Sequence, residues 1–262
     1  MNLSVVIVAQ DEERTIGEVF AAVKPIASEM ILVDSGSTDR TIEIARQSGA
    51  TVRHQDWLGY AAQKNLAISL ASKEWILSLD ADEVLTPELV REIERTLGDE
   101  TQTGTYVGFK IPRVLFIGDR AIRYGAFYPD AQLRLFRKGS GQFNDRLVHE
   151  RVFVNGPERT LRNCMLHRAY KDVPQFESAL EKYARLSVQE AMRSGFKKSR
   201  LSRANELLHP AWTFFYRYVL RGGFLDGPLG LELALLYSDY VRRKIVYLRE
   251  AYNKEQQAQA AS

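Results

Sequence analysis

The first 85 residues alternate between short apolar runs and longer segments that have a helical pattern. Residues 3–8, 30–33 and 75–79 are apolar runs typical of strands buried on both faces, and 51–53 is a shorter run of this type. The segments between them, such as 60–70, carry apolar residues at helical spacing. This alternation predicts right-handed βαβ units, a parallel sheet and an α/β fold.

Polar clusters follow three of the predicted strands. The first strand ends at Ala9-Gln10-Asp11-Glu12-Glu13, the second at Asp34-Ser35 and the fourth at Asp80-Ala81-Asp82. Ligand sites of open α/β sheets lie beyond the carboxyl ends of the strands. We therefore expect the three clusters to converge on one edge of the sheet.

The Asp80-Ala81-Asp82 cluster suits a divalent cation. Mg²⁺ takes oxygen ligands and is commonly held by one or two carboxylates together with the phosphates of a substrate. The alternative interpretation is a solvated acidic turn before a helix, with Thr86 as the N-cap and Pro87 as the first helical residue. The two polar clusters upstream favour the cation site.

The composition limits the classes of protein to which this chain can belong. With 262 residues, of which 45% are hydrophobic, the chain can bury a sizeable core. Cys164 is the only cysteine, so no intramolecular disulfide forms and a reducing compartment is natural. A formal net charge of +3 is too small to indicate nucleic-acid binding. We find neither a signal peptide nor an apolar stretch of the ~18–20 residues that span a bilayer, and we expect a cytoplasmic protein.

The pattern changes twice along the chain. From about residue 101 the helical period fades, and short candidate strands at 106–111, 132–136 and 151–154 are separated by Gly and Pro, as in a mixed sheet with long loops. From about residue 171 the chain becomes helical, basic and aromatic. We expect three parts: residues 1–100, residues 101–170 and a helical C-terminal extension (171–262).

The C-terminal extension has two interpretations. One is an ordinary amphipathic cap on the sheet. The other is a segment that lies in a membrane interface, with aromatic side chains at headgroup depth and basic side chains attracted to anionic lipid. The residues that favour the second are the basic Arg193, Lys197, Lys198, Arg200, Arg203, Arg242, Arg243 and Lys244, and the aromatic Trp212, Phe214, Phe215 and Tyr218.

Three motifs in order resemble family 2 glycosyltransferases with the GT-A fold. They are Ser4 to Glu13, Val33 to Asp39, and Asp80 to Glu83. The resemblance implies a Rossmann-like mixed sheet, mainly parallel in its N-terminal half. It also implies that 1–100 is a nucleotide-sugar-binding half and 101–170 an acceptor-binding half. It continues in Tyr128 to Arg137, Val148-His149-Glu150 and Gly223 to Gly227, which are similar to the bacterial branch that includes lipopolysaccharide-core β-1,4-glucosyltransferases.

The resemblance implies a nucleoside-diphosphate sugar as donor, with a UDP-sugar as the preferred candidate, and Mg²⁺ or Mn²⁺ as cofactor. Asp82 is the expected metal ligand. Asp80 either joins it there or holds a ribose hydroxyl or a metal-bound water. The nucleoside is framed by Ala9, Gln10, Glu12 and Asp34, although Asp34 has the alternative role of a turn residue. Ser35 stands where many members have a second aspartate that meets the nucleobase, so the base stays open.

Direct displacement needs a general base near the acceptor hydroxyl. Glu150 is the preferred candidate, with Asp145 as its rival, and His149 contacts the diphosphate or is structural. Arg134 faces opposite to its neighbours on the predicted strand and either points at phosphate or pairs with Asp130. Lys64 is a further candidate for phosphate.

Together these features predict an inverting, metal-dependent glycosyltransferase at the inner face of the cytoplasmic membrane, acting on a lipid-linked or lipopolysaccharide-core acceptor. Its oligomeric state stays open. A sugar-phosphate nucleotidyltransferase is the alternative enzyme, but the residues after the first strand are acidic and lack glycine. A dinucleotide oxidoreductase is disfavoured, because this chain has no G-x-G-x-x-G motif after its first predicted strand. The non-enzyme alternative is a membrane-bound interaction protein on a transferase scaffold, against which Asp80 and Asp82 argue.

Overall fold

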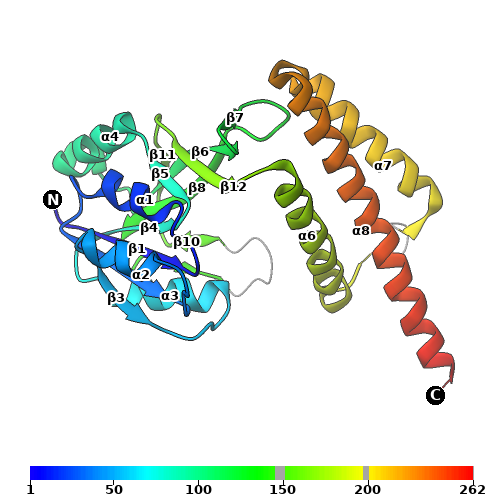
Figure 1. The fold of residues 1–262 in the computed structure, drawn as a ribbon, viewed down its shortest axis with the longest axis horizontal. Coiled ribbons are helices and arrows are strands. Elements are labelled where there is room, and N and C mark those ends of the chain that lie inside the picture. The colour runs from blue at the N-terminus through cyan, green and yellow to red at the C-terminus, as the bar shows by residue number, and fades with distance from the viewer. Residues whose placement is uncertain (145–150, 197–200, 262) are drawn as a thin grey trace. The chain divides into compact units, whose positions relative to one another are not determined.

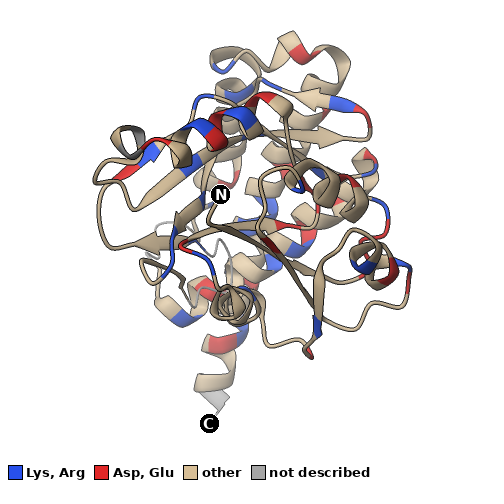
Figure 2. Cartoon of the chain, turned by 90° about the vertical axis from the view of Figure 1, so that its left-hand side faces the viewer, with Lys and Arg blue, Asp and Glu red and all other residues tan. Residues whose placement is uncertain are grey.

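The computed structural model describes residues 1–144, 151–196 and 201–261. The chain forms two compact units (Figure 1). Unit 1 comprises Met1–Phe116 and Pro129–Ala169, and unit 2 comprises Ile117–Tyr128 together with the chain from Tyr170 onward. Basic and acidic residues are interspersed over both units (Figure 2), in keeping with the formal net charge of +3.

Unit 1 is built on a mixed β-sheet. Its strands are β1 (Leu3–Ala9), β2 (Glu29–Asp34), β3 (Thr51–His54), β4 (Trp75–Asp80), β5 (Glu83–Leu85), β6 (Gly108–Ile117), β8 (Asp130–Arg137), β9 (Gly141–Phe143), β10 (Val152–Val154), β11 (Glu158–Thr160) and β12 (Met165–Tyr170).

The order of the main sheet is β3-β2-β1-β4-β8-β6-β12-β5. The pairs β3–β2, β2–β1 and β1–β4 are parallel, whereas β4–β8, β8–β6 and β12–β5 are antiparallel. A separate hairpin pairs β9 with β10. The expected α/β class, with a mainly parallel N-terminal half and a mixed remainder, is confirmed.

Helices cover both faces of this sheet. The helices of unit 1 are α1 (Ile16–Val23), α2 (Thr41–Gln47), α3 (Tyr60–Leu70), α4 (Pro87–Gly98) and α5 (Glu100–Thr103). One core cluster joins Phe20 of α1 and Ile93 of α4 to the sheet, and the other joins Ala67 of α3 to it. The predicted start of α4 is confirmed, because the Thr86 side chain accepts a hydrogen bond from the Leu89 N–H and Pro87 is the first helical residue.

Strand β5 was not expected from the sequence. It has only three residues, and it is held by antiparallel pairing with β12, about 80 residues further along the chain. A strand this short has no periodicity of its own to detect. Its position matters because it begins directly after Asp82 and brings β12 beside the candidate cation site.

Unit 2 is mainly helical. Helix α8 packs against both α6 and α7. Near the start of α8 the backbones are very close, and a Cβ atom at Gly230 would overlap the carbonyl oxygen of Gly223. The elements of unit 2 are the short β7 (Arg120–Ile122), α6 (Val173–Ser194), α7 (Arg203–Phe215), the π-helix η2 (Tyr216–Leu220), the 3₁₀-helix η3 (Gly223–Asp226) and α8 (Gly227–Ala261).

Arg243 of α8 corrects one expectation for the basic residues of this unit. Its guanidinium pairs with Asp239 on the same helix and with Glu177 and Glu181 of α6. The hydrogen bonds to these carboxylates raise the pKa of Arg243 above its ordinary value. Arg243 therefore joins α8 to α6 and supplies no free charge for an anionic surface. Within the described ranges, no helix is both long and apolar enough to cross a membrane.

Candidate active site

The polar clusters that follow β1, β2 and β4 lie at one edge of the sheet, as expected. These three strands are adjacent and parallel, and their register places Ala9 opposite Asp34 and Val8 opposite Asp80. The chain therefore leaves three neighbouring strands at the same level, which brings the residues after them together.

Asp34 closes the turn that follows β2. Its fully buried carboxylate accepts hydrogen bonds from the backbone N–H groups of Gly36 at 2.8 Å and Ser37 at 3.0 Å, and from the Ser37 hydroxyl. This is the turn role that the sequence left as an alternative. Helix α2 begins further on, at Thr41, where Asp39 accepts from both the backbone N–H and the hydroxyl.

Ser35 is linked to the loop before α3. Its hydroxyl oxygen accepts a hydrogen bond from Gln63 Nε2 at 3.0 Å, and its backbone N–H donates to the Ala9 carbonyl at 3.0 Å. Gln63 is fully buried and also bonds the backbone of Gln55 and Leu58. The ends of β1 and β2 and the loop 55–59 thus form one connected surface, whereas Gln10 is exposed.

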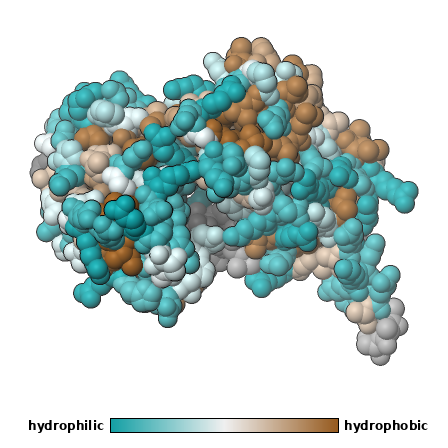
Figure 3. Space-filling view, viewed as in Figure 1, coloured by the Kyte–Doolittle hydropathy of each residue, from teal (hydrophilic) through white to brown (hydrophobic). Residues whose placement is uncertain are grey.

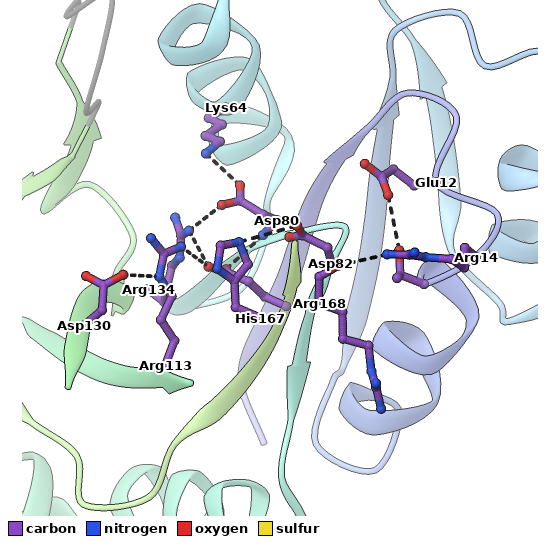
Figure 4. Close-up of polar contacts among 12 residues, drawn as sticks. Glu12, Arg14, Lys64, Asp80, Asp82, Arg113, Asp130, Arg134, His167 and Arg168 are labelled. Carbon is purple, nitrogen blue, oxygen red and sulfur yellow. Dashed lines mark hydrogen bonds and ion pairs between the residues drawn. The ribbon is translucent and has the colours of Figure 1, made fainter. Parts of the chain in front are cut away.

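Asp80 lies in a network of alternating charges (Figure 4). One carboxylate oxygen is 2.6 Å from Lys64 Nζ and the other is 2.5 Å from Arg134 Nη2. Burial acts to raise the pKa of Asp80, but Arg134 and Lys64 outweigh it and hold the pKa below its ordinary value. Because a cation occupies each oxygen, the geometry favours an indirect role for Asp80 at a metal.

Glu83 completes this network beneath Asp80. Its fully buried carboxylate accepts from Arg134 Nη2 at 2.7 Å and from Arg113 Nη1 at 2.9 Å, and it also accepts from the Asp80 backbone N–H at 3.1 Å. Arg113 Nε in turn donates to Asp130 at 2.6 Å. The expected alternative in which Arg134 pairs with Asp130 is wrong, because Arg113 takes that partner. The Nε of Arg134 is buried and has no acceptor among the described residues.

Asp82 lies beside this network, and its carboxylate points toward His167 of β12 (Figure 4). His167 Nε2 lies 3.4 Å from an Asp82 carboxylate oxygen. Burial acts to raise the pKa of Asp82, but His167 outweighs it and the pKa lies below its ordinary value. Sequence reasoning missed His167, since only the pairing of β12 with β5 brings it beside a residue 85 positions earlier.

Glu12 lies on the other side of Asp82. Burial and the nearby Asp82 charge raise the pKa of Glu12 to about 7, and the Thr15 hydroxyl donates to its carboxylate at 3.3 Å. Arg14 is held close by, where its guanidinium donates to the Arg168 carbonyl at 3.1 Å. Glu12 and Asp82 therefore repel each other when both are ionised, and a cation between them would relieve that repulsion.

The protein offers few metal ligands here. Among the residues that the structure describes, no three His, Cys, Asp or Glu side chains are grouped so as to hold a metal. Asp82 and His167 are the pair that fits, since carboxylate oxygen and imidazole nitrogen both bind divalent ions. An ion held by so few side chains needs further ligands from water or from substrate phosphates. Asp145, His149 and Glu150 lie outside the described residues.

Comparison with known proteins agrees with these observations. The family model "Glycosyl transferase family 2" matches residues 4–149. An uncharacterized glycosyltransferase of Rickettsia bellii (strain RML369-C) is 30% identical over 259 residues, which cover 95% of this chain and 86% of that protein. The lipopolysaccharide core biosynthesis glycosyltransferase LpsC of Rhizobium meliloti (strain 1021) is 28% identical over 269 residues, covering 96% of this chain and 94% of LpsC.

Among solved structures, glucosyl-3-phosphoglycerate synthase of Mycobacterium tuberculosis, in complex with Mn²⁺, UDP and glucosyl-3-phosphoglycerate, matches with 27% identity. The match covers 43% of this chain and 44% of that one, with a TM-score of 0.37. The family match spans more than half of the chain, and the Rickettsia relative extends the similarity over nearly its full length. The chain belongs to glycosyltransferase family 2, has the GT-A fold of that family and is a glycosyltransferase.

Proposed function

We propose that this glycosyltransferase is metal-dependent and inverting, and that it transfers a sugar from a nucleoside-diphosphate sugar to a lipid-linked or lipopolysaccharide-core acceptor. The observation that carries the proposal is the placement of Asp82 beside His167, at the edge where β1, β2 and β4 end. A site with two protein ligands and open positions fits a metal that is shared with a diphosphate.

Asp82 and His167 would hold Mg²⁺ or Mn²⁺, and the ion would neutralise charge on the departing diphosphate. Lys64 and Arg134 fix both oxygens of Asp80, which leaves Asp80 rigid beside the ion as a partner for a ribose hydroxyl or a metal-bound water. Arg134 acts on the donor through Asp80, because its own side chain is only 6% exposed. These groups hold and orient the donor and take no part in proton transfer.

The nucleoside is proposed to lie over the ends of β1 and β2. Ala9, Gln10 and Asp34 frame it, and Ser35 offers a hydroxyl in place of a carboxylate. A hydroxyl both donates and accepts hydrogen bonds, whereas a carboxylate only accepts. A UDP-sugar is the proposed donor, and Ser35 leaves room for other bases.

Residues 101–170 and the helical extension 171–262 are proposed to bind the acceptor and to bring the enzyme to it. The acceptor class comes from the similarity to LpsC, whose name assigns it to lipopolysaccharide core biosynthesis. We place the enzyme on the inner face of the cytoplasmic membrane, where such an acceptor is built on lipid.

Glu150 is the proposed general base, and Asp145 is its rival. Glu150→Gln keeps the shape of the side chain but removes the base, so transfer should fall by a factor of about 10²–10⁴ while donor binding persists. The measurement is transfer rate together with the dissociation constant of UDP. If Asp145→Asn shows this loss and Glu150→Gln does not, the base is Asp145.

Metal-dependent donor binding and hydrolysis test the function as a whole. Calorimetric titration with UDP should show binding in the presence of Mn²⁺ that excess EDTA abolishes, because the Asp82 carboxylate repels a diphosphate unless a cation lies between them. Under the same conditions, a panel of nucleoside-diphosphate sugars should yield metal-dependent release of the free sugar. Release of pyrophosphate from a nucleoside triphosphate and a sugar phosphate would instead identify a nucleotidyltransferase.

A further inference from the structure

Large apolar side chains are exposed along one part of unit 2. They lie on α7, η2, η3 and the first turns of α8, and Figure 3 shows them as a brown area over these elements. Leu207 is 72% exposed, Trp212 60%, Leu225 57% and Leu235 54%. We call this surface, which also includes Leu220 and Phe224, the apolar face.

The apolar face is not the packing surface of α7. Helix α7 packs on α8 through Pro210, which is buried and whose carbonyl accepts from the Ser238 hydroxyl at 2.8 Å. Leu233 and Ala234 of α8 are also buried. The exposed residues are thus additional to those that the fold needs. Exposed apolar patches beyond a few hundred Å² mark interaction sites in soluble proteins.

Arginines border the apolar face. The segment that carries Arg120 and Arg123 is fastened to η3, because the Asp226 carboxylate accepts from the backbone N–H groups of Arg123 and Tyr124 and the Asp226 carbonyl accepts from Arg120. Gly125 N–H donates to the Arg221 carbonyl at 3.0 Å. Arg120, Arg123 and Arg221 are all exposed beside Leu220 and Leu225, and the exposed acids of these segments are Asp119 and Glu232.

Arg217 makes this arrangement rigid. Its guanidinium lies 3.4 Å from the ring centroid of Tyr237 and 4.7 Å from that of Phe127, and it donates to the Gly125 carbonyl at 2.6 Å. Burial lowers the pKa of Arg217 below its ordinary value. Segment 117–128 is therefore held against η2 and α8, and the arginines keep their place beside the apolar face.

We propose that the apolar face inserts into the interface of an anionic lipid bilayer, with Arg123 and Arg221 contacting the headgroup phosphates. The inference rests on the proposed function, because a lipid-linked acceptor requires the enzyme to reach a membrane. Exposed aromatic and aliphatic residues next to basic ones are the chemistry of interfacial helices. Neither Arg123 nor Arg221 forms an ion pair with a described residue, so both are available to phosphate.

A second copy of the chain fits this surface less well than lipid does. In a two-fold contact the same patch meets itself, so its excess of basic groups, Arg120, Arg123 and Arg221 against Asp119 and Glu232, would be doubled. Anionic phosphate removes that conflict. The proposal adds Arg123 and Arg221 to the basic residues that the sequence favoured, 193–203 and 242–244, of which 197–200 lie outside the described residues.

The test is sedimentation with vesicles of phosphatidylcholine and phosphatidylglycerol, using the full chain. Leu220→Glu with Leu225→Glu should lower binding at least tenfold at both low and high salt, because charges are placed where apolar side chains insert. Arg123→Gln with Arg221→Gln should lower binding about 30-fold at low salt, from ~1 kcal/mol for each arginine, and much less at high salt. The matched control is Leu58→Glu, at an apolar residue of unit 1 that is 53% exposed.

Insertion has its own readout in the fluorescence of Trp212. Lipids brominated on their acyl chains should quench the intact protein, and Trp212→Phe should remove that quenching. Unchanged vesicle binding in both double variants would overturn the proposal. So would the absence of quenching together with a concentration-dependent dimer that Leu220→Glu with Leu225→Glu dissociates.

Donor hydrolysis separates this inference from the proposed function. Both double variants should hydrolyse the sugar nucleotide as the intact protein does, since neither changes a residue of the donor site. Vesicle binding without any donor hydrolysis would refute the proposed function and leave the insertion surface standing. Donor hydrolysis without vesicle binding would refute the insertion surface alone.

Discussion

Asp82→Asn should lower kcat/KM by about 10²–10⁴, because a carboxylate that supports a metal contributes several kcal/mol and each ~1.4 kcal/mol is a factor of ten. The amide keeps the size of the side chain but loses the charge that His167 faces at 3.4 Å. The measurements are transfer kinetics and a titration with Mn²⁺ in the presence of UDP. Both should change, while the far-ultraviolet circular dichroism should not.

Asp119→Asn is the matched control. It makes the same chemical change at an exposed aspartate outside unit 1, and it should leave activity unchanged. Wild-type turnover in excess EDTA, or an Asp82→Asn enzyme as active as Asp119→Asn, would refute the metal role of Asp82.

Glu83→Ala should destabilise unit 1 by about 3–5 kcal/mol, the usual cost of removing one partner from a buried ion pair. Glu83 is fully buried and accepts hydrogen bonds from both Arg113 and Arg134. Without it, the buried guanidinium groups of Arg113 and Arg134 each lose a carboxylate acceptor. Urea denaturation, followed by amide hydrogen exchange of β4 and β8, measures the loss.

Glu43→Ala provides the comparison for Glu83→Ala. Glu43 pairs with Arg40 at 3.0 Å, but the two side chains are 50% and 66% exposed, and such surface pairs contribute little to stability. If the two variants lose stability equally, Asp80 and Asp130 suffice for the arginines, and Glu83 is not the centre of the network.

The sequence was most informative where the information is local. The strand that ends at Asp80 and the helix that begins at Pro87 were predicted because burial, capping and turn chemistry act over a few residues. The convergence of Ala9, Asp34 and Asp80 followed as well, since adjacent parallel strands place their ends at one level.

The partners of these residues could not be predicted in the same way. Arg113 and His167 reach the site through antiparallel pairing of β4, β8 and β6 and of β5 with β12. Such pairing joins residues tens of positions apart, and no local pattern records it. For the same reason Arg134 had two possible partners in the sequence and has its ion pairs with Asp80 and Glu83 in the structure.

The helical extension shows a different limit. Helical spacing identifies aromatic residues but does not say which of them a neighbouring helix covers. Trp212 and Phe215 are exposed, whereas Phe214 and Tyr218 stack on each other with ring centroids 5.3 Å apart and are partly buried. Only the packing of α7 on α8 separates the two groups.

The close approach of Gly223 and Gly230 limits how unit 2 can change in evolution. A side chain at Gly230 would overlap the Gly223 backbone, and a Cβ atom at Gly223 would lie 2.8 Å from the Arg217 carbonyl oxygen. Only glycine, which has no Cβ atom, therefore fits at either position. The outward-facing Leu220, Phe224 and Leu225 have no such restriction and can exchange for other apolar types. Amino-acid substitutions during evolution are therefore confined to the outer surface of this region, while the two glycines keep its backbone unchanged.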